Sequence, residues 1–354
     1  MARQKNFSRT IGVFYGSRSV EHDNSVATAK ALIPALLGMG YNVVSVYQTP
    51  DNQWFIKRHE DSDSIDLVPD SYQSSAAEDW RLHLNQPRVL RFSRPGTFSN
   101  LKIDIDIVFP VFHGLSAEDG TLQGLCDLLG VQYIGCSLTA AALAQDKVLA
   151  KDILRTFNLP TMNHVYFTSN EWTDYQEKLI EAVEQSLGYP VYCKPARLGG
   201  SVAVAHVSNS EDLVQAVETA IERDDKVLIE RAAQNPIDIK VAVTGNYYRP
   251  DQIQVSRPVV TSEITNAVVQ KLTTKMMKGI QEVARQCFVS FEGTGIMQID
   301  FVMESAGLDY YVIEIDPMPH RLAFGLWEQS GITPDQLIRE LVRLSDENHD
   351  KLTN

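Results

Sequence analysis

The sequence predicts a mixed α/β and α+β protein: an N-terminal domain on a parallel sheet, followed by two smaller α+β subdomains. At 354 residues the chain is long for a single hydrophobic core. Its first third alternates apolar strands with helical patterns, as βαβ units do. Its last third contains two neighbouring apolar strands joined by a short turn, residues 295–303 and 308–316. We expect domain boundaries near 135–140 and 208–212, giving residues 1–136, 137–210 and 211–354.

The first βαβ unit is the clearest local pattern. Residues 10–16, TIGVFYG, form a short apolar run that ends in a polar loop containing glycine. Residues 25–37 show helical periodicity, which Gly38 and Gly40 end. Residues 41–47 are rich in β-branched side chains and predict the next strand. Because strand, helix and strand follow each other in this order, we expect the two strands to pair in parallel.

The remaining elements follow from the same criteria, taken in chain order. In the polar stretch 50–100 we expect weaker strands at 53–57 and 88–92 around an exposed insertion at 58–85. A single buried strand at 103–112 precedes a helix from residue 121 and a strand at 131–134. One long helix is expected from residue 137 to about 158. Beyond it we expect strands within 161–232 and 237–246, a polar loop at 247–262, and helices at 170–186, 210–223, 264–287 and 334–344.

Composition and charge narrow the class of protein. The chain is 44% hydrophobic and 22% charged, as folded soluble proteins are. Its net charge of −13 argues against a nucleic-acid partner, because phosphate backbones are held by clustered Lys and Arg. No apolar run is long enough for a membrane span or a signal peptide. The four cysteines are scattered without a CxxC pair, which favours reduced thiols and a cytoplasmic location.

Three carboxylates near the C-terminus form the most informative chemical pattern. Glu314 and Asp316 are two residues apart on a predicted strand, so they point to the same face. Pairing with the preceding strand brings Asp300 beside them. Three such acids repel one another unless a cation lies among them, and oxygen-only ligands suit Mg²⁺ bound with nucleotide phosphates. Solvated acids at the strand ends are the alternative.

Two lysines upstream are candidates for binding phosphate. Lys194 follows a buried strand and precedes the glycine-containing loop RLGGSV, whose backbone N–H groups are accessible to a polyphosphate. The loop does not match the GxxxxGKS motif, and an ordinary hairpin turn is the alternative. Lys147 lies in a helical run, where most lysines are merely solvated. Glu230 and Asp238 end or begin apolar strands and could accept hydrogen bonds from adenosine, or simply be solvated.

The loops after the first and third parallel strands carry further polar residues. Glu21 and His113 lie in these loops, at the carboxyl edge where open α/β sheets bind ligands. His113 precedes a glycine and could contact a carboxylate. A dinucleotide site is the competing interpretation, but GSRSVE lacks the GxGxxG spacing and no suitable acid follows the second strand.

In their order, these segments resemble the D-alanine–D-alanine ligases of the ATP-grasp superfamily. The resemblance covers nearly the whole chain and rests on these stretches: FYGSRSVEHDNSVATAKAL, DIVFPVFHGLSAEDGTLQGLCDLLGVQYIG, ALAQDKVLAKDIL, KPARLGGSVAVAHV, KVLIERA, IDIKVAVTGN and IDFVM…VIEID. The HG…EDGTLQG and ALAxDK segments are specific to this family. The resemblance implies an ATP-grasp fold of two subdomains that enclose ATP, behind an N-terminal domain of Rossmann-like topology.

The resemblance also implies roles on the nucleotide side. Lys147 and Lys194 would hold the ATP phosphates, and the loop Gly199–Ser201 would close over them. Glu230 and Asp238 would bind adenosine, with Asp238 where the family usually has Glu. The cofactors would be ATP and Mg²⁺, with Mn²⁺ as an alternative ion.

For the metal and the substrates, the implied residues come from both ends of the chain. Asp300, Glu314 and Asp316 would hold the cation. Glu21 would bind the amino group of the first amino acid, and His113 would lie near the second. The first carboxylate would become an acyl phosphate, and attack by the second amine would give a dipeptide for peptidoglycan synthesis.

The residues that depart from the family pattern are those expected to bind the second substrate or to stabilise the transition state. Gln298 stands where the family has an Arg that stabilises the oxyanion, and loss of such a donor costs roughly 10²–10³ in rate. Asp316 replaces an Asn. Gly200 replaces a Ser that orients substrate, leaving Ser201, which we group with Glu21, His113 and Gln298 as catalytic. The stretch 317–327 lacks the usual hydroxyls, and the lid segment after residue 246 is short.

Three functional hypotheses follow. The first is a D-alanine–D-alanine ligase or a close dipeptide ligase. The second is a ligase with a different amine acceptor, since His320 and Arg321 suit a larger or more anionic nucleophile. The third is an ATP-binding relative without turnover, motivated by Gln298. Arg321 or Arg257 could restore the missing positive charge. Small amino acids are the expected partners, and many ligases of this family are homodimers.

Overall fold

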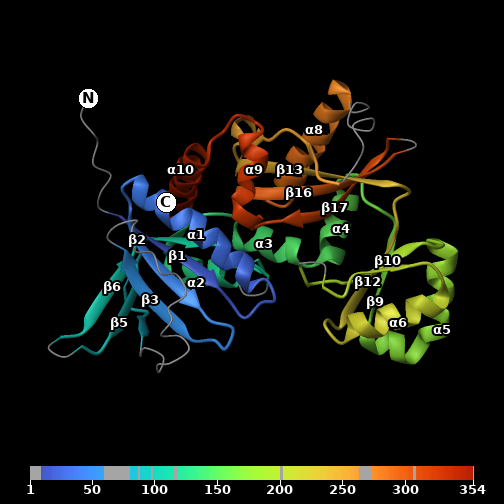
Figure 1. Ribbon diagram of the computed structural model, residues 1–354, viewed down its shortest axis with the longest axis horizontal. Helices are drawn as coiled ribbons and strands as arrows, with labels where there is room; N and C mark the ends of the chain where they lie inside the picture. Colours follow the sequence, from blue (N-terminus) through green and yellow to red (C-terminus); the bar gives the residue numbers. More distant parts are fainter. Residues whose placement is uncertain are drawn as a thin grey trace.

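The structure is a computed structural model that describes residues 9–59, 80–86, 88–96, 99–114, 118–199, 202–262, 273–305 and 308–353. Within these residues the chain forms three sheet-based units (Figure 1). The N-terminal sheet and α1 lie at one end, a four-stranded sheet with α5 and α6 lies at the other, and the sheet containing β13, β16 and β17 lies between them. The expected α/β and α+β architecture is confirmed.

The N-terminal sheet has the strand order β3-β2-β1-β7-β8. Its strands are β1 (Thr10–Gly16), β2 (Asn42–Gln48), β3 (Trp54–His59), β7 (Ile107–Pro110) and β8 (Gln132–Tyr133). The pairs β1–β2, β1–β7 and β7–β8 are parallel, as expected, while β3 adds an antiparallel edge. Helix α1 (His22–Gly38) begins three residues before the predicted helix, and α2 (Thr121–Leu129) begins where predicted. β1 is buried throughout, as an apolar run in a parallel sheet should be.

The single strand expected at 103–112 is wrong, because the chain divides there into two strands. β6 (Leu101–Ile105) joins β4 (Arg81–His83) and β5 (Leu90–Arg94) in a small antiparallel sheet, and β7 enters the main sheet. Asp106 marks the division: its carboxylate accepts a hydrogen bond from the Thr10 N–H at 2.6 Å, and its own N–H donates to the Thr10 carbonyl. Most of the expected insertion at 58–85 lies outside the described residues.

The long helix expected from residue 137 is also wrong, because it is two helices. α3 (Leu138–Gln145) ends at Asp146, and α4 (Lys147–Thr156) begins immediately after it. The Asp146 backbone is extended (φ −92°, ψ 104°), and its carboxylate accepts hydrogen bonds from the N–H groups of Val148 and Leu149. An Asp in this N-cap position offers the backbone an alternative to a continuous helix. Lys147 is therefore the first residue of α4.

The four-stranded sheet has the order β11-β10-β12-β9 and is covered by two helices. These elements are β9 (His164–Thr168), α5 (Ser169–Ser186), β10 (Val191–Pro195), β11 (Ala205–Val207), α6 (Ser210–Ile221) and β12 (Lys226–Arg231). β12 lies between β10 and β9, although it follows residue 210, where we expected this subdomain to end. Strand β10 delivers Lys194, and β12 delivers Glu230 beside it.

The C-terminal sheet is built on three long antiparallel strands. They are β13 (Pro236–Asn246), β16 (Thr294–Glu304) and β17 (Tyr310–Asp316), covered by α8 (Thr274–Ser290). The expected loop at 247–262 is partly structured, since β14 (Gln254–Val255) and β15 (Val259–Val260) pair with β13, with the short 3₁₀ helix η2 (Pro250–Gln252) before them. The first residues of the helix expected at 264–287 lie outside the described residues.

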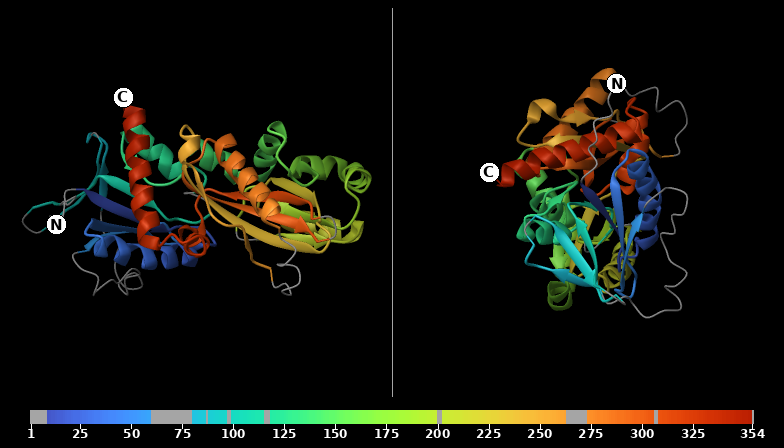
Figure 2. Two further views of the ribbon diagram at one scale, coloured as in Figure 1. Left: turned by 90° about the horizontal axis from the view of Figure 1, so that it is seen from above. Right: turned by 90° about the vertical axis from the view of Figure 1, so that its left-hand side faces the viewer.

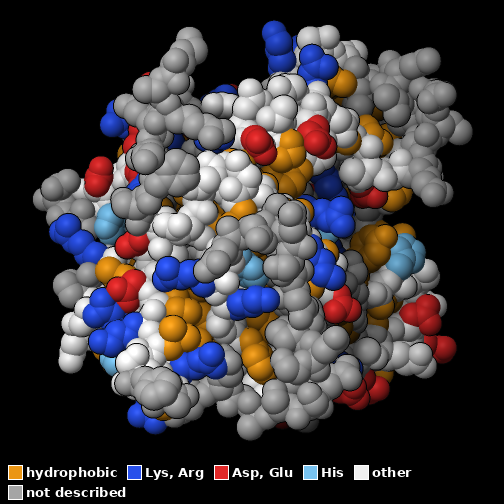
Figure 3. Space-filling model, turned by 60° about the vertical axis from the view of Figure 1, so that its left-hand side comes forward, with side chains coloured by type: hydrophobic (Ala, Val, Ile, Leu, Met, Phe, Trp, Pro, Cys, Tyr) orange, Lys and Arg blue, Asp and Glu red, His pale blue; other side chains and the backbone are white. Residues whose placement is uncertain are grey.

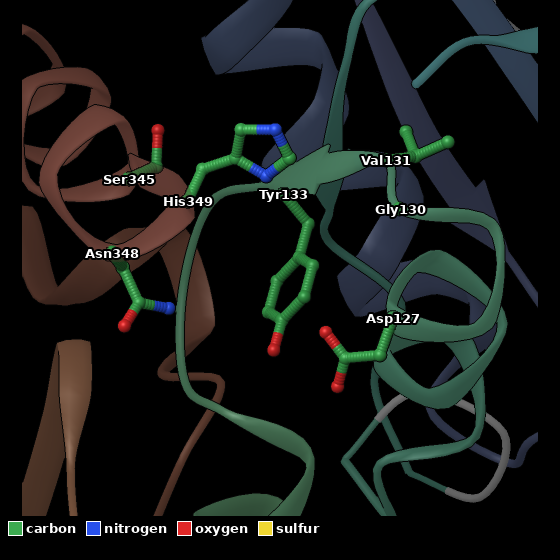
Figure 4. Close-up of a pocket in the computed structure, with 7 residues that line it drawn as sticks. All are labelled: Asp127, Gly130, Val131, Tyr133, Ser345, Asn348 and His349. Atoms are coloured by element: carbon green, nitrogen blue, oxygen red, sulfur yellow. The ribbon is translucent and has the colours of Figure 1, made fainter. Parts of the chain in front are cut away.

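The end of the chain packs back onto the N-terminal domain. After the 3₁₀ turn η3 (His320–Ala323) come α9 (Phe324–Glu328) and α10 (Pro334–Thr353), and α10 lies between the N-terminal and C-terminal sheets (Figure 2). Leu337, Leu341 and Leu344 share one hydrophobic cluster with residues of β1 and α1. At the rim of this joint a pocket separates Asp127 and Tyr133 from Ser345, Asn348 and His349 of α10 (Figure 4).

The distribution of basic side chains and the state of the cysteines can be compared with the sequence. Lys and Arg side chains are scattered over the face shown in Figure 3, with hydrophobic and acidic side chains between them. All four cysteines are buried and free. None of the helices in the described part of the chain is both long and apolar enough to cross a membrane.

Candidate active site

Two adjoining pockets collect most of the residues singled out in the sequence. The first lies between the four-stranded sheet and the C-terminal sheet, and the second lies between the C-terminal sheet and the N-terminal domain. Lys147 and Glu314 line both pockets, so the two spaces meet at these side chains. The pocket of Figure 4 shares no described lining residue with them.

The first pocket combines apolar walls with charged ends. Its apolar lining comes from both sheets and from the loop after β10: Met162, Tyr192, Leu198, Val204, Ala233, Val302 and Ile313. Lys147, Lys194, Glu230, Arg231, Asp238 and Glu314 supply the charges. Apolar walls combined with lysine side chains suit an aromatic base with a phosphate chain. We refer to it as the nucleotide pocket.

A buried ion triad holds Lys194 in this pocket. Lys194 Nζ donates to Glu230 Oε2 at 2.7 Å, and Lys151 from α4 donates to the other carboxylate oxygen. Burial raises the pKa of Glu230, but the two lysines outweigh it and lower the pKa to about 2. The carboxylate is therefore ionised and fixes the ammonium group of Lys194 at the pocket wall.

Lys147 lies where the two pockets meet because α4 begins at that residue. Its N–H donates to the Ala196 carbonyl at 2.9 Å, and its Nζ donates to the Leu198 carbonyl at 2.7 Å. The same Nζ lies 3.5 Å from Glu314 Oε1. The side chain is thus stretched between α4, the loop after β10 and the end of β17.

The second pocket is lined by a row of charges across three strands. Lys240 on β13 lies opposite Asp300 on β16, which lies opposite Glu314 on β17. Gln298 lies opposite Asp316 one step along the strands. Residues that face each other in an antiparallel pair, and those two apart on one strand, share a face. All five line this pocket, together with Glu21, Glu118, Gln145 and Gly199. We refer to it as the carboxylate pocket.

Asp300 receives both of its hydrogen bonds from within the sheet. Lys240 Nζ lies 2.9 Å from Asp300 Oδ2, and Gln298 Nε2 donates to Asp300 Oδ1 at 2.8 Å. Burial raises the pKa of Asp300, and Lys240 opposes that rise. Burial, followed by the charge of Glu118, raises the pKa of Asp316 well above its ordinary value. Burial and Glu118 likewise raise the pKa of Glu21.

The carboxylate oxygens that line this pocket are ligands suited to a divalent cation. Five carboxylates and two lysines are among the described lining residues, so negative charge exceeds positive charge. Among these residues, no group of three carboxylate, His or Cys side chains is already placed to hold a metal ion. Instead, the ammonium groups of Lys240 and Lys147 lie beside Asp300 and Glu314. Oxygen-only donors in this excess are what Mg²⁺ selects.

The far end of the carboxylate pocket is built from the two N-terminal loops. His113 is buried, its Nδ1 lies 3.4 Å from Glu118 Oε1, and its Nε2 lies 3.2 Å from Thr28 Oγ1. Gly114 (φ +76°) fits here because a Cβ would lie 2.1 Å from Ser19 Oγ. A Cβ on Gly199 would lie 3.1 Å from Glu21 Oε2, so the loop after β10 closes against the N-terminal domain.

Of the predicted site residues that the structure describes, all but His113 line one of the two pockets, and His113 Nδ1 lies 3.4 Å from Oε1 of the pocket-lining Glu118. Gly200 and Ser201 lie outside the described residues. The two arginines proposed to replace the missing charge do not line the carboxylate pocket: Arg257 lines a separate pocket beside α8, and the Arg321 N–H donates to Thr28 Oγ1. The His320 ring lies beside His113, with 5.6 Å between ring centroids.

The sequence patterns described above single out neither Glu118, Lys151 nor Lys240, which the structure adds to this site. Signals for two of them were present. Lys151 is four residues after Lys147 and so lies near it on a helix, and Lys240 is two residues after Asp238 on one strand face.

Comparison with known proteins agrees with this arrangement. A family model described as the D-ala D-ala ligase N-terminus matches residues 10–136, and one described as the D-ala D-ala ligase C-terminus matches residues 153–343. A D-alanine–D-alanine ligase from Caldicellulosiruptor bescii is 31% identical over 96% of this chain and 95% of its own length. One from Macrococcus caseolyticus is 29% identical over 96% of both chains.

Solved structures share the fold. The D-alanine-D-alanine ligase from Coxiella burnetii superposes with a TM-score of 0.84 at 23% identity, covering 98% of this chain and 97% of its own. A D-Ala:D-Ser ligase from Enterococcus faecalis superposes with a TM-score of 0.78 at 22% identity, covering 96% and 99%. At this level of identity the likeness concerns the fold.

Proposed function

The chain belongs to the D-alanine–D-alanine ligase family and is an ATP-dependent ligase that forms a C–N bond, and we propose that the two adjoining pockets are its active site. The observation that carries this proposal is the junction at Lys147 and Glu314, where an apolar slot for a nucleotide opens into a carboxylate-lined space beside Glu21. A phosphoryl group bound at that junction would lie next to an amino acid in the second pocket.

On the nucleotide side, Lys147 and Lys194 neutralise the phosphates, and Glu230 keeps Lys194 in position. Asp238, exposed at the rim of the nucleotide pocket, faces the adenosine together with Glu230. Asp300, Glu314 and Asp316 hold Mg²⁺, for which Mn²⁺ is an alternative. When bound, Mg²⁺·ATP supplies the phosphoryl group that activates the first carboxylate. Gly199 lines the carboxylate pocket, and the family resemblance implies that the loop it begins binds the phosphates.

On the amino-acid side, Glu21 accepts hydrogen bonds from the ammonium group of the first substrate. His113, held by Glu118 and Thr28, lies towards the second substrate. The first substrate is D-alanine and the product a dipeptide, as in the curated relatives. We propose that acceptor specificity is set at this end; the His320 ring beside His113 supports a test of acceptors other than D-alanine. We also propose a cytoplasmic homodimer, as the family resemblance implies.

The direct test is turnover by the purified chain. With ATP, Mg²⁺ and D-alanine we expect phosphate and dipeptide in equal amounts, with D-serine and other amines tried as acceptors. Asp300→Asn should lower kcat by about 10²–10³, because it weakens the binding of Mg²⁺, the counter-ion of the transferring phosphoryl group. Asp309→Asn, an exposed acid beside the same strand pair, is the matched control and should leave kcat unchanged.

Release of phosphate that does not depend on any amino acid, or no release with any pair of D- or L-amino acids, would refute the ligase assignment. Absence of release together with saturable ATP binding would favour the ATP-binding relative without turnover, whereas release independent of amino acids would indicate an ATPase.

A further inference from the structure

The carboxylate pocket has a positive charge that sequence reasoning did not assign. Gln298, which replaces the arginine of the family, uses its amide N–H on Asp300. Directly beside it, Lys240 projects from β13 towards the other oxygen of Asp300. Lys240 therefore lies one strand away from the position where the arginine charge is missing.

The register of the sheet fixes this placement. Lys240 pairs with Asp300, and Ala242 pairs with Gln298, so Lys240 is two residues from the strand position directly opposite Gln298. Ala242 is uncharged and fully buried, so it cannot supply a cation beside Gln298. The Lys240 side chain is 38% exposed, compared with 15% for Asp300, so its ammonium end opens into the pocket while its partner is covered.

The other lysines that line the two pockets have partners other than Asp300. Lys147, which lines both pockets, donates from Nζ to the Leu198 carbonyl and lies 3.5 Å from Glu314 Oε1. Lys194 is held by Glu230 in the nucleotide pocket. Arg257 and Arg321 are not among the described residues that line the carboxylate pocket. Among the described residues that line the carboxylate pocket, Lys240 therefore supplies the positive charge beside Gln298, since both side chains contact Asp300.

From this geometry, and resting on the proposed ligase function, we propose that Lys240 is a catalytic residue that binds the carbonyl oxygen of the first substrate during amide formation. It takes over the electrostatic task of the arginine that Gln298 has replaced.

The step it serves is attack of the second amine on the acyl phosphate. The nitrogen lone pair forms the C–N bond, and the C=O π pair moves onto oxygen. When the carbonyl re-forms, the C–O bond to phosphate breaks and its electron pair leaves with the phosphate. The nitrogen loses one proton to solvent. Lys240 gives up no proton: its ammonium group donates a charge-assisted hydrogen bond to the transient oxyanion.

The ion pair with Asp300 is compatible with this role. When a divalent cation takes the Asp300 carboxylate, the Lys240 ammonium loses its partner and is free to turn towards a substrate oxygen. The same competition has a second measurable effect. Because the Lys240 ammonium group must leave Asp300 before a cation binds there, removing it should lower the Mg²⁺ concentration that the enzyme needs.

The test compares Lys240→Gln and Lys240→Arg with the unaltered chain, and uses Lys102→Gln as the matched control, an exposed strand lysine on β6. We expect Lys240→Gln to lower kcat by about 10²–10³. It should change the Kd for ATP less than threefold and lower the Mg²⁺ concentration needed for half-maximal rate. Lys240→Arg should keep most of the activity. Gln298→Arg should recover at least tenfold in the Lys240→Gln background and change the unaltered chain far less.

A binding measurement decides the matter independently of turnover. A dipeptide phosphinate, whose tetrahedral P–O⁻ mimics the oxyanion, should bind at least tenfold more weakly to Lys240→Gln by calorimetry, with thermal melts confirming that the variant folds. Equal phosphinate affinity, unchanged kcat, or a parallel loss of ATP binding would overturn the role of Lys240. Failure of the unaltered chain to turn over would instead refute the ligase function, and the phosphinate comparison would still decide on Lys240.

Discussion

At the scale of single residues, Glu230 shows how one buried carboxylate organises the nucleotide pocket. Only 2% of its side chain is exposed, and Lys151 and Lys194 take its two oxygens. Glu230 at a strand end was evident from the sequence, but its two lysine partners were not. Lys151 is 79 residues away along the chain, and no local pattern predicts which side chains meet over such a separation. The same holds for Lys240 and Asp300, which only the register of β13 and β16 brings together.

We predict that Glu230→Gln destabilises the fold by about 3–5 kcal/mol, because it leaves buried lysines without their counter-charge. Urea unfolding at pH 7 measures this. Glu218→Gln, an exposed acid on α6, is the control and should change stability by less than about 0.5 kcal/mol.

The same variant carries a pH signature. Lys151 and Lys194 overcome the effect of burial and hold the pKa of Glu230 at about 2, below its ordinary value of 4.5. The ionised group therefore stabilises the fold fully above pH 4.5, and this contribution is lost as the pH falls through about 2. The unaltered chain should lose stability more steeply than Glu230→Gln over this window. Equal slopes, or a variant as stable as the control, would rule out the ion triad.

At the scale of elements, most helices and strands could be predicted from periodicity, but two breaks could not. The apolar pattern runs without interruption through Asp106 and Asp146, so each stretch was expected to be one element. In both cases a short carboxylate accepts a backbone N–H at the break. At Asp146 the donor lies in the first turn of the next helix, whereas at Asp106 it is Thr10, 96 residues away along the chain, and apolar spacing reports neither contact. The break at Asp146 matters most for function, because it places Lys147 at the start of α4.

Helix α10 is the element that ties the end of the chain to the N-terminal domain. Leu341 is fully buried in the cluster that includes β1 and α1, and Arg9 Nη2 donates to Asp346 Oδ2 at 3.1 Å. We predict that Leu341→Ala costs about 2–5 kcal/mol in urea unfolding, because it leaves a cavity where two units meet. Leu128→Ala, at an 82% exposed position on α2, is the control. If Leu341→Ala lowered the free energy of unfolding by less than about 1 kcal/mol, the packing of α10 on the N-terminal domain would contribute little to stability.

At the scale of the whole molecule, the proposed active site forms where three units meet. The N-terminal loops bring Glu21 and His113, β10 and β12 bring Lys194 and Glu230, and the C-terminal sheet brings the acids. The resemblance of ordered segments was enough to predict the fold and the ligase chemistry, while the site residues stay predictions. It could not predict how a departure such as Gln298 is compensated, because the compensating side chain lies on another strand.

The proposed active site requires Lys147, Lys194 and the three acids of the C-terminal sheet to act on one magnesium-bound triphosphate. Calorimetric titration of the purified chain with ATP, in excess Mg²⁺ and again with the cation removed by a chelator, tests this most directly. We expect one ATP per chain with Mg²⁺, and binding at least tenfold weaker both without the cation and in Lys194→Met. Equal binding with and without Mg²⁺, or undiminished binding by Lys194→Met, would contradict the convergence of these residues on a single ligand.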